Sequence, residues 1–280
     1  MSGANPGTTP ERTPEERGAA PCTPPPHPPG RGLAGLGPAL GAAGVVLALW
    51  YLLAHSGSVA PGLLPTPGRT AAALADSARS GTLAADLGAS LTRAGQGFAL
   101  GAAIGSALGF TTGYLPVVSA AVTPVVSFLR PIPAIALVPL ATAWFGIGES
   151  AKRLLIAYAV LLAVWLYVHD GVSRVPVSHL RAARSLGAPL HRRFTEVLLP
   201  AAAPAVLAAL RYGASVALLA LVAAELGGAD SGLAYRLQVD GQFLRVDRMF
   251  AGLLVLGVLG VTVDLVLAAV GRRFVHWSAS

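Results

Sequence analysis

The feature that most constrains this sequence is the recurrence of apolar stretches, each nearly free of charge. A helix crosses a bilayer core of about 30 Å with roughly twenty apolar residues. Of the 280 residues, 54% are hydrophobic and 12% are charged. Soluble domains carry about 25% charged residues. The sequence therefore predicts an integral membrane protein of the all-α class.

Six stretches are long enough to serve as transmembrane helices. They are about residues 33–54, 91–113, 117–145, 154–172, 200–224 and 249–270. Six spans place both termini on one side of the membrane. The loop 173–199 carries five arginines, and Lys and Arg near membrane ends favour the cytoplasmic side. We expect this loop and both termini to be cytoplasmic, in a multi-pass protein of the cell membrane.

The segments outside the spans differ in composition. Residues 1–30 contain nine of the 22 prolines and almost no bulky apolar residues, too few to offset the entropy of ordering. We therefore expect a disordered cytoplasmic tail over 1–32 and a membrane domain over 33–280. The lone cysteine, Cys22, lies in this tail, so no internal disulfide can form. The connector 55–86 is expected to hold a surface helix in its alanine-rich part.

Two spans carry a pattern of their own. Glycines recur every fourth residue from Gly97 to Gly113, so they lie near one helix face and allow another helix to approach closely. In the span 117–145, Pro131 and Pro133 must interrupt the helical hydrogen bonds, which is tolerated at membrane depth only where protein or a cavity satisfies the backbone.

The loop before the fifth span reads RAARSLGAPLHRRFTEVLLP over residues 181–200. Residues 180–186 can form a short amphipathic helix, with Leu180, Ala183 and Leu186 on related faces. Gly187 would let the chain leave that helix, and Pro200 would lie in the first turn of the next. A short helix at the membrane surface suits docking of a partner. An ordinary basic loop is the alternative.

This segment resembles the coupling loop of ABC-importer permeases. The family pattern is Glu-Ala-Ala, two residues, an aliphatic residue, Gly, nine residues, Ile or Val, one residue, Leu-Pro. The positions that match are Ala182, Ala183, Leu186, Gly187, Val197, Leu199 and Pro200. Arg181 stands where the family has its leading Glu, which puts in doubt the contact that this Glu makes. The change implies either a matching acidic change on the partner or an impaired subunit.

Four other stretches resemble one branch of these permeases, those for aliphatic sulfonates, taurine and nitrate. They are residues 63–74, 127–160, 221–235 and 249–277. The resemblance implies a type I ABC-importer transmembrane domain of six helices. It also implies a second permease subunit, expected to be another copy, a cytoplasmic ABC ATPase dimer and an extracytoplasmic solute-binding protein. The solute would be a small anion passed by alternating access.

Composition argues against several other classes of function. Lys152 lies in GIGESAKR, where Ala151 occupies the position of the second glycine that a phosphate-binding loop requires. We therefore expect no enzyme activity and no cofactor, with ATP bound by the partner. Neither a nucleophile–base pair nor a metal cluster is evident. The net charge of +7 is spread between spans rather than gathered on one face, which disfavours nucleic-acid binding.

Ionisable residues in or at the ends of the spans form the remaining candidate site. They are Arg93, Arg130, Asp170, Arg211, Glu225 and Asp264. A charge at the bilayer centre costs about 3 kcal/mol or more, so each needs a partner or a hydrated path. Arg130 and Arg211 could line the path of an anionic solute. Alternatively they pair with Asp170 or Glu225, or cap carbonyls freed by the prolines, and we favour this pairing interpretation.

Other functions remain open from sequence alone. Arg181 is compatible with a membrane scaffold or an orphan subunit that does not couple to ATP. A permease for another small solute, such as a pyrimidine vitamin precursor, is also compatible with the pattern. An intramembrane enzyme lacks a supporting set of residues.

Overall fold

The computed structural model describes residues 36–56 and 62–274, and every regular element in these ranges is helical. The predicted tail, 1–32, lies outside the described residues. The chain divides into a unit of residues 1–49 and a unit of residues 50–280, with the apolar helix α1 (Leu36–His55) running across the division. The following description concerns the second unit.

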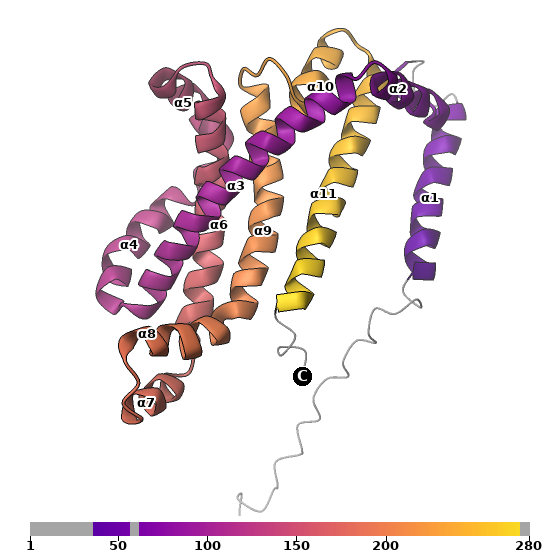
Figure 1. Cartoon of the computed structure of the whole chain (residues 1–280). Helices are drawn as coiled ribbons and strands as arrows, with labels where there is room; N and C mark the ends of the chain where they lie inside the picture. Colours follow the sequence, from indigo (N-terminus) through magenta and orange to yellow (C-terminus); the bar gives the residue numbers. More distant parts are fainter. Residues whose placement is uncertain (1–35, 57–61, 275–280) are drawn as a thin grey trace, which may run out of the picture. The chain divides into compact units, whose positions relative to one another are not determined.

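The second unit consists of a bundle of long helices with short helices at its two ends (Figure 1). The long ones are α3 (Thr82–Tyr114), α6 (Glu149–Ser173), α9 (Leu199–Leu226) and α11 (Val246–Phe274). At one end lie α2 (Pro67–Arg79), α5 (Val138–Phe145) and α10 (Leu233–Gln242). At the opposite end lie α7 (Val177–Ser185) and α8 (Leu190–Arg192). The surface helix expected in the connector is α2.

Three helices are long and apolar enough to cross a membrane: Glu149–Ser173, Leu190–Leu226 and Val246–Arg273. The segment α4 (Pro116–Leu129) and the pair formed by the 3₁₀ turn η3 (Ala134–Leu137) and α5 are apolar enough together to cross a membrane, but they are bent by 86° at the break between them. This is the interruption that Pro131 and Pro133 predict. In the sequence, helices α1 and α3 cover most of the other two predicted spans, 33–54 and 91–113. The apolar half of α3 is dominated by glycine and alanine.

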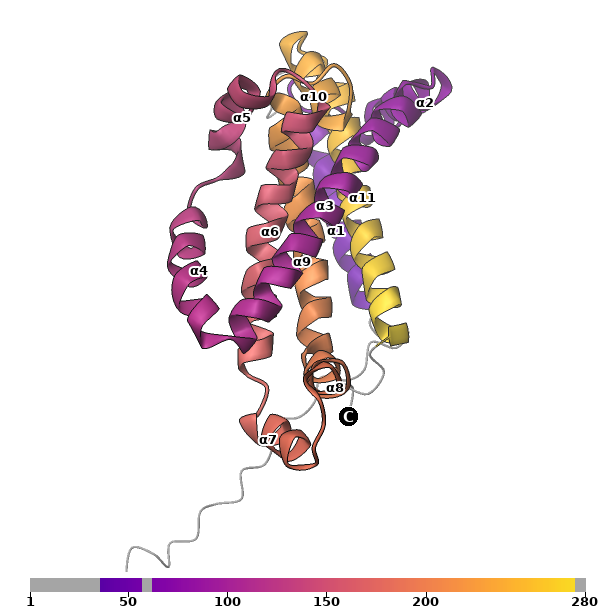
Figure 2. The same ribbon diagram turned by 60° about the vertical axis from the view of Figure 1, so that its left-hand side comes forward.

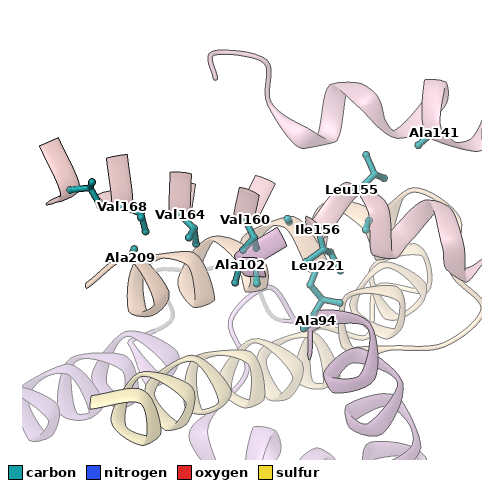
Figure 3. Packing of buried hydrophobic residues seen from close by; sticks show 14 of the residues in the cluster. Ala94, Ala102, Ala141, Leu155, Ile156, Val160, Val164, Val168, Ala209 and Leu221 are labelled. Carbon is teal, nitrogen blue, oxygen red and sulfur yellow. The ribbon is translucent and has the colours of Figure 1, made fainter. Parts of the chain in front are cut away.

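Helix α6 is the most buried helix of the bundle and packs against both α3 and α9. Its Val160, Val164 and Val168 pack among small residues, including Ala209 of α9 (Figure 3). The glycines of α3 also pack closely on α6, and Gly101 and Gly105 lie against its backbone. A Cβ atom added at Gly101 would stand 2.5 Å from the Ala157 carbonyl oxygen. The predicted role of the glycine series in close packing is confirmed.

Gly105 offers a direct test of this contact. A Cβ atom there would meet the Leu161 carbonyl oxygen at 2.7 Å, and backbone atoms cannot move aside by a rotamer change. Overpacking a close contact costs about 1–3 kcal/mol. We expect Gly105→Ala to lower the thermal unfolding midpoint of the detergent-solubilised protein by several degrees.

Gly95→Ala is the matched control, because a Cβ atom at Gly95 of the same helix meets nothing within 4 Å. Alanine favours helix over glycine by about 1 kcal/mol, so this variant should be as stable as the parent or slightly more so. Equal midpoints for the two variants would show that the α3–α6 contact is not close.

Candidate functional site

The end of α7 is shaped by a glycine in the left-handed backbone region. Gly187 has a φ of +74°. Its N–H donates to the Arg184 carbonyl at 3.0 Å, and the Ala188 N–H donates to the Ala183 carbonyl at 3.0 Å. These two bonds define a Schellman motif, in which a residue other than Gly or Asn is unfavourable at the left-handed position. The predicted exit from the short helix at Gly187 is confirmed, with the helix spanning Val177–Ser185.

The turn after α7 presents apolar side chains to the surroundings. Leu186 is 87% exposed and Leu190 is 65% exposed, whereas Leu180 and Ala183 are half-buried, so Leu186 does not share their environment as the predicted amphipathic pattern requires. Arg181 and Arg184 are exposed, and neither guanidinium has a hydrogen-bond or ion-pair partner among the described residues. We call residues 177–190 the coupling turn. It presents the exposed Leu186 and Leu190 beside two cations that have no partner among the described residues.

The coupling turn leads into a long helical run that includes α9. The helical run begins at Leu190 and extends to Leu226, 37 residues in all. Before Pro200 the run is widened into the π-helical segment η4 (Arg193–Leu198). Proline has no N–H and its ring crowds the carbonyl four residues earlier, which a π turn accommodates. Pro200 lies in the first turn of α9, as predicted, but η4 and α8 extend the helical run back to Leu190, which the sequence did not predict.

The base of this run is anchored to the bundle. Leu198 is 1% exposed and Val197 is half-buried, while Leu199 is partly exposed. The Phe194 ring meets Phe110 of α3 edge-on at 5.5 Å between centroids. A displacement of the coupling turn would therefore reach α9 through the helical run that begins at Leu190.

At the opposite end of the bundle, the Arg93 side chain is 5% exposed and all five of its N–H groups are used. Nε and Nη2 donate to the two carboxylate oxygens of Glu149 at 2.6 and 2.9 Å. Nη1 donates to Glu225 Oε1 at 2.9 Å and to the Ser231 carbonyl at 2.5 Å. The fifth bond goes to Ser231 Oγ at 3.1 Å. Arg93 thus joins α3, α6, α9 and the loop before α10.

Glu225 is fully buried, and its carboxylate is satisfied on both oxygens. Besides Arg93, Oε1 accepts a bond from Ser90 Oγ at 2.6 Å, and Oε2 accepts one from the Ala234 N–H at 2.8 Å. Gly232 lies so close to this carboxylate that a Cβ atom would clash with it. A buried charge is tolerated when it is paired and fully hydrogen-bonded in this way.

The same network holds the first turn of α10. Asp86 accepts a bond from the Gly232 N–H at 3.0 Å, and Ser90 Oγ accepts one from the Leu233 N–H at 2.9 Å. Together with the bond from Ala234, these satisfy N–H groups that a helix start leaves without an intrahelical partner. We call Arg93, Glu149, Glu225, Ser90 and Asp86 the charge network.

Two groups on α10, outside the spans, extend the charge network outward. Arg236 Nε donates to Asp86 at 2.9 Å, and this hydrogen bond raises the pKa of Arg236. Burial raises the pKa of the Asp240 carboxyl, although Arg248, Arg245 and Arg236 act in the other direction. Charge pairing thus fixes α10 over the end of the bundle.

Halfway along the bundle, Arg211 of α9 and Asp264 of α11 form a bidentate ion pair. Arg211 Nη2 lies 2.8 and 2.9 Å from the two carboxylate oxygens, and Nε lies 3.1 Å from one of them. The two side chains are 44% and 47% exposed. The charges of this pair compensate each other within the chain.

Arg130 differs from Arg211, because its guanidinium has no hydrogen-bond or ion-pair partner in residues 36–56 and 62–274. It is exposed at the break between α4 and η3 and lines a cavity of about 290 Å³. The Leu129 carbonyl next to it is satisfied instead by the Tyr158 hydroxyl at 2.8 Å and the Ile132 N–H at 3.1 Å.

Comparison with known proteins shows the family to which the chain belongs. The model of the binding-protein-dependent transport system inner membrane component family matches residues 97–276, more than half of the chain. The chain belongs to this family of ABC-importer permeases. It is therefore a transport subunit, a multi-pass component of the inner membrane.

Relatives of similar length cover most of the permease. It is 32% identical over 236 residues to the putative aliphatic sulfonates transport permease protein SsuC of Bacillus subtilis, covering 84% of this chain and 86% of that protein. It is 35% identical over 243 residues to the taurine transport system permease protein TauC of Escherichia coli, covering 85% and 88%.

Solved structures show the same fold at low identity. An inward-facing structure of the MetNI methionine ABC transporter matches with a TM-score of 0.54 and 21% identity, covering 67% of this chain and 92% of that one. An amino acid ABC transporter matches with a TM-score of 0.53 and 17% identity, covering 68% and 91%. The predicted fold class, an all-α type I importer transmembrane domain, is confirmed.

The charge pairs in the structure differ from the predicted ones. The interpretation that Arg211 is paired is confirmed, but its partner is Asp264 rather than Asp170 or Glu225. Glu225 pairs with Arg93, which lies 132 residues away in the chain. The Asp170 carboxylate has no partner among the described residues. Arg130 neither pairs with an acid there nor caps a freed carbonyl.

The charge network should contribute strongly to the stability of the permease. Glu225→Ala would leave Glu149 as the acidic partner of Arg93 but would remove the acceptor of three buried donors, on Arg93, Ser90 and Ala234, and each unsatisfied donor costs about 1–3 kcal/mol. We expect a large drop in the thermal unfolding midpoint in detergent and a low yield of folded protein. Asp76→Ala is the control, because the Asp76–Arg79 pair is 69% and 80% exposed and such pairs contribute little. Equal midpoints would contradict the structural role of the network.

Proposed function

We propose that this permease imports a small organic anion, a sulfonate or taurine-like solute, driven by a separate ABC ATPase dimer. The coupling turn is the ATPase-docking element and lies in the cytoplasm, as do both termini. A solute-binding protein delivers the solute at the opposite end, where α2, α5 and α10 lie. The second permease subunit is another copy of this chain, and ATP is bound and hydrolysed on the partner alone.

One observation carries the proposal: an exposed Leu186 on a glycine-closed turn that leads into the long helical run including α9. A docking partner that moves this turn would move α9 with it. Arg181, Ala182, Ala183, Leu186 and Gly187 form the docking element, and Val197, Leu199 and Pro200 form the base that transmits the displacement. Arg181 would require an acidic group on the ATPase.

Support for the solute class comes from the relatives and from charge. Relatives that cover over four-fifths of the chain are named for aliphatic sulfonates and taurine. Arg130 places an uncompensated positive charge in the membrane-spanning part, which favours passage of an anion. A neutral solute such as a pyrimidine would not compensate that positive charge.

The direct test is uptake by proteoliposomes that contain the permease together with its cognate ABC ATPase and solute-binding protein. We expect uptake of radiolabelled taurine or ethanesulfonate that depends on ATP at the coupling-turn side. Within this assay, Gly187→Val should lower uptake at normal protein level. A non-glycine residue in the left-handed region costs about 1–2 kcal/mol, and a β-branched one is among the least tolerant.

Gly187→Asn is the matched control, because asparagine adopts the left-handed conformation more readily. A Cβ atom at Gly187 meets nothing within 4 Å, so the two variants differ in backbone strain rather than in clashes. Asn should retain most of the uptake that Val loses. Normal ATP-driven uptake with Val would exclude a coupling role for this turn, and import of a neutral pyrimidine alone would exclude the anion.

A further inference from the structure

The break between α4 and the pair formed by η3 and α5 opens a cavity at mid-depth of the bundle. In Figure 2 the connection between α4 and α5 lies halfway between the two ends and beside α6. The cavity has a volume of about 290 Å³ and is walled by this connection, by α6 and by α9. A hollow at this depth is where a solute in transit could rest.

One end of the cavity is positively charged. Arg130 lines it and has neither an acidic partner nor a hydrogen bond from its guanidinium among the residues that the structure describes. An unpaired cation at membrane depth is costly, so a compensating anion would be bound favourably there. Arg211 cannot serve in this way, since Asp264 already holds its guanidinium by three hydrogen bonds.

A structural purpose for Arg130 is not supported by its surroundings. The carbonyl freed at the end of α4, that of Leu129, is already satisfied by Tyr158 and by the Ile132 N–H. The guanidinium is thus available for a ligand.

The remaining walls are mostly apolar. They include Ile132, Pro133, Leu162, Ala163 and Val216, and two tyrosines, Tyr158 and Tyr212, add polar groups. An inorganic anion would leave this apolar surface uncovered, whereas a short alkyl chain would bury it at about 25 cal/mol per Å². The wall chemistry therefore favours an organic anion with one charged end over nitrate or sulfate.

We propose that the permease itself holds a binding site for a short-chain organic sulfonate, with Arg130 on the sulfonate group and the Leu162–Ala163–Val216 wall on the alkyl chain. This inference rests on the proposed function and deepens it. The site in the permease adds a second selectivity step in the membrane, after selection by the binding protein. The site selects by chain length as well as by charge.

Equilibrium dialysis of radiolabelled ethanesulfonate against the purified permease–ATPase complex, without binding protein, tests the site. We expect saturable binding that competes poorly with nitrate and sulfate. Arg130→Gln should weaken it at least tenfold, and Arg130→Lys should retain part of the affinity because it keeps the charge. Arg79→Gln, on the exposed surface of α2, is the control and should bind as the parent does.

Ala163→Leu separates a binding role from a structural one. Filling the apolar wall should weaken binding of pentanesulfonate severalfold more than binding of methanesulfonate. A parent complex that imports sulfonates but binds none without its binding protein would overturn the inference and leave the proposed function intact. Equal binding by Arg130→Gln would also overturn it. If Arg130→Gln lost binding because it lost thermal stability, and Arg130→Lys did not rescue either, Arg130 would have a structural role. That result would overturn the site.

Discussion

The structure depends on close packing and polar bonds between the long helices α3, α6 and α9, since no hydrophobic driving force holds helices together in lipid. Lipid tails are as apolar as the helix surfaces, so association requires close packing and satisfied polar groups. The glycine face of α3 supplies the packing by letting its backbone lie on that of α6. Arg93 supplies the polar part, because its five hydrogen bonds tie α3 to α6, to α9 and to the loop before α10.

These contacts divide the permease into an end held by several buried polar bonds and an end held by apolar contacts at Leu198 and Phe194. The charge network holds the end with α10 by buried bonds, so motion there requires breaking several of them together. At the other end, α7 has no buried residue, and short non-helical connections join it to α6 and to the helical run that begins at Leu190. A force applied to the coupling turn would therefore tilt α9 about the end that the charge network holds. The paired Arg211 and the cavity at Arg130 lie between the two ends, where such a tilt would alter access.

The features that sequence predicts here are those encoded within a few neighbouring residues. The Schellman turn needs only the six residues around Gly187, the glycine face needs one helix, and the break after α4 needs two prolines. The partners of the buried charges are different. Arg93 and Glu225 are far apart in sequence, and their contact depends on the order and rotation of helices, which hydropathy does not encode. The early start of the helix at Leu190 was also missed, since a π turn before Pro200 has no clear signal in residue type.

The central claim is that the coupling turn meets the ATPase, and cross-linking tests this most directly. A photoreactive amino acid placed at Leu186 of the assembled transporter should form a cross-link to the ATPase, since Leu186 is 87% exposed at the tip of the turn. The same probe at Phe243, which is 64% exposed beside α10, should form none. A cross-link to the ATPase from Phe243 and none from Leu186 would contradict the account.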